Sequence, residues 1–179
     1  MKKLILLLFI PLVFTCSSDS SDDNTNDTVP VDDTNPVYLD TNGVTIKARD
    51  WAEIGMQGEI NGIIYTIVDR QTLCQELYNW QFNNGDTHPN TMVTTFITDF
   101  SAGITPVTNC VLMRISQFSG FDISSWDVSN GTNFEGLFKN YFPQEQEVIF
   151  FPDISNWDIS SAVNLQEMFC NNPLYNPDI

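Results

Sequence analysis

Apolar and polar residues alternate in two different rhythms along the chain, and each rhythm predicts a different element. Two apolar runs flank Asn61-Gly62, a pair that favours a two-residue β-hairpin turn. Leu73, Leu77 and Trp80 then recur at helical spacing after Asp69, and either Asp69 or Thr72 is suited to capping this helix. The pattern therefore predicts a hairpin followed by a helix within residues 37–80.

Farther along, one stretch occurs twice. Residues 122–138 return as residues 153–169, at an offset of 31 and with 8 of 17 positions identical. Residues 175–179 open a third copy, so we expect a truncated repeat at that point. Tandem recurrence at such a period is typical of a solenoid, in which each unit buries its apolar face against its neighbour.

The apolar spacing within a copy predicts the shape of one unit. Trp126 and Val128 are two residues apart, as on one face of a strand, and Phe134, Leu137 and Phe138 follow at the spacing of a helical turn. The second copy repeats both spacings: Trp157, Ile159, Leu165, Met168 and Phe169. The prediction is an α/β solenoid with a short strand and a short helix in each unit, and with its tryptophans pointing inward.

The domain plan follows from these patterns. The hairpin and helix of residues 37–80 are expected to cap the first open face of the solenoid, since solenoid ends need a capping unit. Residues 81–117 are expected to hold a loop and a degenerate first repeat, and residues 118–179 the repeats themselves.

The sequence motif D-I-S-x-W-D-V-S-N-x-T-N-x-x-x-x-F resembles the repeats of the BspA-like leucine-rich-repeat surface proteins of bacteria. The chain departs from the usual Val-Thr-Asn-Met of that pattern at residues 131–134 and 162–165. The resemblance implies a leucine-rich-repeat-like fold and a surface-exposed role in binding or adhesion. It supplies no catalytic residue to transfer.

The amino-terminal residues predict export and anchoring. A basic start, Met1-Lys-Lys3, precedes an apolar run from Leu4 to Phe14, which is the layout of a signal peptide over residues 1–15. Val13-Phe-Thr-Cys16 resembles a bacterial lipobox, so Cys16 is the expected lipidation site, with a plain secreted protein as the alternative. Residues 16–36 are acidic and polar and predict a disordered tether. The expected location is the outer membrane or cell surface, through a lipid anchor.

The net charge of the chain limits the classes of partner that we expect. The formal net charge is −16, and removal of residues 1–15 would leave 5 basic and 23 acidic side chains, a net charge of −18. Such a surplus opposes nucleic-acid binding, which depends on Lys and Arg contacts to phosphates. A protein or glycan at the cell surface is the expected partner.

The predicted strand places one row of polar side chains opposite the core. If the tryptophans point inward, Asp127 and its neighbours lie on the exposed face and stack against the matching residues of the second copy. We predict a ligand-binding row from these residues: Ser125, Asp127, Ser129, Asn156, Asp158 and Ser160. A cation, a basic protein segment or sugar hydroxyls would suit it. Alternatively, the acids only accept hydrogen bonds from nearby hydroxyls and backbone N–H groups.

Little else in the chain suggests chemistry. With the single histidine, His88, in a loop, the sequence offers no Ser-His-Asp arrangement and predicts no metal site and no cofactor. Three disulfide pairings are possible among Cys74, Cys110 and Cys170, and Cys74 with Cys110 is the preferred one. We therefore expect a non-catalytic surface lipoprotein for protein–protein interaction or adhesion. A surface polysaccharide-binding lipoprotein is the alternative.

Overall fold

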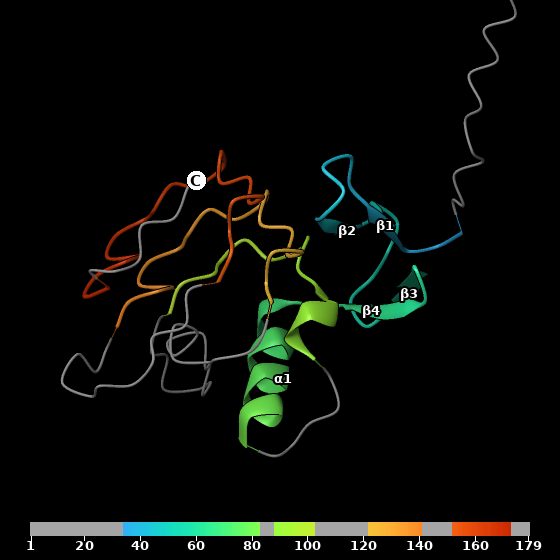
Figure 1. Ribbon diagram of the computed structural model, residues 1–179, viewed down its shortest axis with the longest axis horizontal. Coiled ribbons are helices and arrows are strands. Elements are labelled where there is room, and N and C mark those ends of the chain that lie inside the picture. Colours follow the sequence, from blue (N-terminus) through green and yellow to red (C-terminus); the bar gives the residue numbers. More distant parts are fainter. Residues whose placement is uncertain (1–33, 83–87, 103–121, 141–151, 173–179) are drawn as a thin grey trace, which may run out of the picture. The chain divides into compact units, whose positions relative to one another are not determined.

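The computed structural model describes residues 34–82, 88–102, 122–140 and 152–172 (Figure 1). All of them belong to one compact unit, residues 32–179. Its elements are β1 (Val37–Leu39), β2 (Ile46–Ala48), β3 (Gln57–Ile60), β4 (Ile63–Ile67), α1 (Arg70–Phe82), a 3-10 turn (Pro89–Thr91) and β5 (Met92–Val93). The predicted signal peptide, Cys16 and the predicted third copy lie outside the described residues. In the described ranges, no helix is long and apolar enough to cross a membrane.

The hairpin predicted at Asn61-Gly62 is formed by β3 and β4. The two strands pair antiparallel, with Ile60 opposite Ile63 across the turn. Both turn residues have positive φ, +52° at Asn61 and +83° at Gly62, as a type I′ turn requires. Strand β5 then adds in parallel to the other edge of β4.

Helix α1 begins where the sequence predicted. The Asp69 carboxylate accepts the backbone N–H of Thr72 at 2.7 Å and so satisfies one of the unpaired donors of the first turn. Leu73 and Leu77 are fully buried and belong to a core cluster that also contains Trp126 of the repeats. The helix therefore packs against the repeats.

A second hairpin, β1–β2, is held together by its connecting loop and by the repeats. Asn42 accepts the N–H groups of Val44 and Thr45 in the loop, which brings β2 back antiparallel to β1. The backbone N–H of Ile46 donates to the carbonyl of Ser125 at 2.9 Å, across to the first repeat. Alternation along β2 buries Ile46 and leaves Lys47 partly exposed on the other face.

The two copies run side by side in parallel (orange and red in Figure 1). Asn133 pairs with Asn164 of the second copy on one side and with Asp99 on the other. The carbonyl of Thr98 accepts the N–H of Thr132 in the same way as that of Thr132 accepts the N–H of Val163. Residues around Asp99 thus occupy the place of a preceding unit, within the segment predicted to hold a degenerate repeat.

Rings at matching positions of the copies stack on one another. The Trp126 and Trp157 rings lie 6.4 Å apart at 7°, and Phe138 lies over Phe169 at 5.6 Å and 5°. Both tryptophans point inward, as predicted, with 0% and 6% of their surface exposed. Each indole N–H is satisfied by a backbone carbonyl, that of Pro89 for Trp126 and that of Ile123 for Trp157. Neither ring is therefore exposed at the surface, and both belong to the core.

The strand and the helical turn expected inside each copy are absent from the described repeats. Residues 126–128 and 157–159 form no strand, while residues 135–138 and 166–171 are turns. The reason is local: Asp127 accepts the N–H of Ser129, and Asn133 accepts the N–H of Glu135. Such side-chain acceptors compete with regular structure and turn the backbone repeatedly.

Candidate functional site

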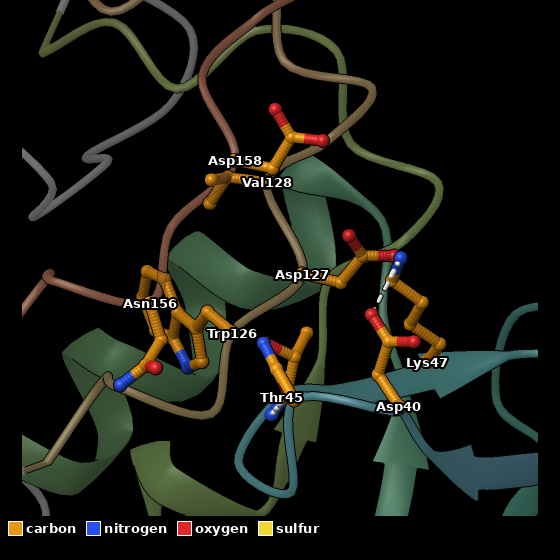
Figure 2. Close-up of a pocket in the computed structure, with 9 residues that line it drawn as sticks. Asp40, Thr45, Lys47, Trp126, Asp127, Val128, Asn156 and Asp158 are labelled. Atoms are coloured by element: carbon orange, nitrogen blue, oxygen red, sulfur yellow. Dashed lines mark hydrogen bonds and ion pairs between the residues drawn. The ribbon is translucent and has the colours of Figure 1, made fainter. Parts of the chain in front are cut away.

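A small polar pocket lies where the β1–β2 hairpin meets the two copies (Figure 2). The pocket is open to solvent, and the empty space within and in front of it amounts to about 270 Å³. Its lining comes from the hairpin and from both copies, which contribute one pair of matching positions, Asp127 and Asp158. The lining residues are Asp40, Asn42, Thr45, Lys47, Trp126, Asp127, Val128, Asn156 and Asp158. Residues more than 80 positions apart in the chain are therefore brought together.

The hairpin contributes one ion pair. The Lys47 ammonium lies 2.9 Å from Asp40 Oδ2, and the two side chains are only 24% and 25% exposed. The hydrogen bond with Asp40 raises the pKa of Lys47 above its usual value, against the opposing effect of burial, and the negative charge of Asp127 adds to the increase. The same bond with Lys47 is the largest cause that lowers the pKa of Asp40.

Asp127 is the most buried acid of the pocket, with 2% of its surface exposed. Its Oδ1 accepts the Ser129 hydroxyl at 2.7 Å and the Ser129 N–H at 3.2 Å. Its Oδ2 is buried and has no hydrogen-bond partner in the described part of the chain. Figure 2 shows this carboxylate turned toward the side of the pocket where Lys47 and Asp40 meet.

The second copy contributes an exposed acid at the equivalent position. Asp158 Oδ1 accepts the Ser160 N–H at 3.0 Å, and hydrogen bonding from Ser160 is the main cause that lowers the Asp158 pKa, with a further contribution from the charge of Lys47. Asn156 lies two residues earlier and also lines the pocket. At neutral pH the lining therefore carries three carboxylates against one ammonium group.

Three of the six predicted ligand-binding residues meet here, namely Asp127, Asn156 and Asp158. The three serines, Ser125, Ser129 and Ser160, are not among the lining residues. Ser125 donates to the carbonyl of Asn90, while Ser129 supports Asp127 through its hydroxyl and Ser160 supports Asp158 through its N–H. The serines thus orient the acids or the backbone.

The expectation that Asp127 lies on an exposed face is wrong. The β1–β2 hairpin covers this part of the first copy, whereas the equivalent Asp158 remains exposed. The prediction also missed the hairpin residues Asp40 and Lys47. The alternation of β2 places Lys47 on the polar face of its strand, and this signal could have marked it as a counter-ion for the acidic repeats.

The cysteines are partly described. Cys74 is disulfide-bonded, and Cys170 is a free thiol. Cys110 lies outside the described residues, so its pairing with Cys74 stays a prediction.

No set of three or more His, Cys, Asp or Glu side chains in the described ranges could hold a metal ion. Figure 2 shows the Asp158 carboxylate apart from those of Asp127 and Asp40. As it stands, the pocket can accept hydrogen bonds and attract positive charge.

Comparison with known proteins gives a family match. The family model described as Mycoplasma protein of unknown function, DUF285, matches residues 66–148 and, a second time, residues 104–179. No curated protein and no solved structure matches the chain. The repeat side of the pocket lies within the matched region, and its hairpin side, residues 40–47, precedes it.

Proposed function

This chain belongs to the family described as Mycoplasma protein of unknown function, DUF285, and from that premise we propose that it is a BspA-like surface lipoprotein. Its repeats form a solenoid that binds a partner, in protein–protein interaction or adhesion, and it carries out no catalysis. The parallel pairing of Asn133 with Asp99 and Asn164 supports the solenoid, because the same backbone position links three successive segments.

The proposed location depends on the amino-terminal sequence. A basic start, an apolar run and Cys16 in a lipobox-like setting support cleavage before Cys16 and its lipidation. More than one acyl chain on the cysteine would hold the protein on a membrane stably. The acidic, polar residues 17–36 would then act as a tether between the membrane and the folded unit.

One observation carries the binding role. The Oδ2 atom of Asp127 is a buried acceptor without a partner among the residues that the structure describes, in a pocket that three separate segments build together. Buried polar atoms are almost always paired, so an unpaired one beside a pocket indicates a donor that a ligand supplies. The net charge of −16 favours a basic partner over an acidic one.

The anchor is tested by metabolic labelling with a fatty acid in a bacterium that processes lipoproteins. We expect label in the wild-type chain and none in Cys16→Ser, and we expect external protease to remove the wild-type protein from intact cells. Label in the Cys16→Ser chain, or full protection from protease, would refute anchored surface display.

The binding role is tested by adhesion. Cells that display the full chain should attach to surfaces coated with a basic protein more strongly than cells that lack it. Cells that display Asp127→Asn together with Asp158→Asn at equal density should lose most of this gain. Attachment that does not depend on the displayed chain would refute the role.

Recognition of a surface polysaccharide is the second candidate. The pocket is rich in amide and carboxylate oxygens, which can accept hydrogen bonds from sugar hydroxyl groups. These oxygens belong to Asp40, Asn42, Asp127, Asn156 and Asp158. Binding to a glycan array that persists at high salt would favour this alternative, since attraction between opposite charges is screened under those conditions.

A further inference from the structure

The unpaired oxygen of Asp127 lies in a pocket whose own cation is already engaged. Lys47 donates to Asp40 at 2.9 Å, and Asp127 has both of its Ser129 contacts on Oδ1. Oδ2 therefore has no donor in the described residues. An acceptor left in this state costs on the order of 1–3 kcal/mol, more for a charged group, and a bound donor would recover that cost.

Charge indicates what kind of donor this is. Three carboxylates and one ammonium line the pocket, which leaves a deficit of two positive charges at neutral pH. A neutral hydroxyl would satisfy Oδ2 but would leave this deficit in place. A cationic donor would satisfy Oδ2 and would also reduce the deficit of positive charge.

A metal ion fits poorly. Calcium takes six to eight oxygen ligands at short distance, and Mg²⁺ requires near-ideal octahedral geometry. The described acids form no cluster of three that could hold a metal ion, and the Lys47 ammonium sits among them. A cationic side chain brings its charge with directed N–H donors and needs no such cage.

We propose that this pocket receives the guanidinium group of an arginine from a basic segment of a partner protein. The inference rests on the binding role proposed above and names the chemistry of the partner. The planar guanidinium has five donors in a fixed fork, so one group can donate to Asp127 Oδ2 and to a second acceptor of the pocket together. The ammonium group of lysine is a compact charge that is more strongly hydrated than a guanidinium group, so we expect lysine to bind more weakly than arginine.

The test uses the purified full chain and two peptides of equal shape. One is acetyl-Gly-Arg-Gly-amide, and the other replaces arginine with citrulline, which keeps the planar group but has no charge. Binding is measured by titration calorimetry or by shifts of the indole N–H resonances in NMR spectra. We expect the arginine peptide to bind at least tenfold more tightly than the citrulline peptide and to weaken as salt is raised.

Variants locate the binding. Asp127→Asn and Asp158→Asn should each reduce affinity for the arginine peptide about tenfold or more, while the unfolding midpoint shows that each variant is folded. Asp153→Asn is the matched control: Asp153 is exposed and accepts the N–H of Ser155, as Asp158 accepts that of Ser160, but it does not line the pocket. Its affinity should equal that of the wild type.

Several outcomes would overturn the inference. They are equal affinity for the arginine and citrulline peptides, wild-type affinity in folded Asp127→Asn, and calcium binding that depends on Asp127 while the arginine peptide fails to bind. The adhesion role is judged separately. Arginine binding without adhesion would support the pocket assignment and refute the adhesion role. Adhesion that is unchanged in Asp127→Asn would support the adhesion role and refute the use of this pocket in it.

Discussion

Replacing Lys47 with methionine tests the electrostatics of the pocket most directly. Methionine keeps an unbranched side chain of similar length and removes only the charge and its donors. The change leaves the Asp40, Asp127 and Asp158 carboxylates in one pocket with no cation among the lining residues. We expect the folded state to lose stability because the Asp127 carboxylate, 98% buried, loses the nearby positive charge and cannot move into solvent.

The magnitude follows from two contributions. The Lys47–Asp40 pair, at 2.9 Å and about one quarter exposed, is worth about 1 kcal/mol after screening by solvent. The loss of the nearby positive charge from the buried Asp127 adds about 1–3 kcal/mol. The free energy of unfolding should therefore fall by about 2–4 kcal/mol at pH 7, a large share of the 5–15 kcal/mol typical of a domain.

The assay is urea unfolding of the full chain with its disulfide intact, followed by tryptophan fluorescence, since Trp126 and Trp157 are buried in the fold. The midpoint should fall while the slope with urea stays constant. Adding Asp127→Asn to Lys47→Met should recover at least half of the loss. A single variant within 0.5 kcal/mol of wild type, or a double variant without recovery, would refute the reasoning.

The pH dependence of this pair has a definite sign. The lowered pKa of Asp40 contributes stability that is present above its unfolded value, about 4, and is lost as pH falls through the folded pKa. The raised pKa of Lys47 contributes stability that is present below about 10.4 and is lost as pH rises through the folded pKa. The difference between wild type and Lys47→Met should therefore be largest between about pH 5 and pH 9 and should shrink toward both ends.

Two further variants probe the scaffold. Gly131→Ala should lower the free energy of unfolding in urea by about 1–3 kcal/mol, because the added methyl group would overlap the fully buried Phe134 ring. The reverse change at the matching position, Ala162→Gly, should lower it by about 1 kcal/mol or less. A Gly131→Ala chain as stable as the wild type would contradict this packing. Asp69→Ala should cost about 1 kcal/mol by loss of the cap on Thr72, whereas Asp69→Asn should retain most of it, and equal loss in both would show that charge rather than capping matters.

Local patterns in the sequence were sufficient for several features. Asn61-Gly62 predicts its hairpin because a type I′ turn needs two residues that tolerate positive φ, and Asp69 predicts a helix start because its carboxylate can accept an N–H three residues on. The inward direction of Trp126 and Trp157 followed from their two-residue spacing with Val128 and Ile159, which puts each pair on one face. Each of these conclusions depends on neighbours in the chain or on exact recurrence.

The conformation inside each repeat was less predictable. A two-residue apolar spacing indicated a strand, yet the acceptors of Asp127 and Asn133 bind nearby N–H groups and produce turns. Hydrophobic spacing reports which side chains are buried, and a coil with repeated turns can bury the same set as a strand and helix. The pattern therefore identified most of the core residues, although Leu165 is exposed, and it did not predict the turns of the described backbone.

The sequence alone determined which residues recur, where the β3–β4 hairpin and helix α1 lie, and that Trp126 and Trp157 face the core. Only the tertiary structure decided that β1–β2 folds over the first copy, so that Asp127 is buried beside Lys47 while its counterpart Asp158 stays exposed. Repeated sequence makes two positions chemically alike, but burial and charge depend on what packs against each position. That contact joins residues about 80 positions apart, and no local pattern encodes it.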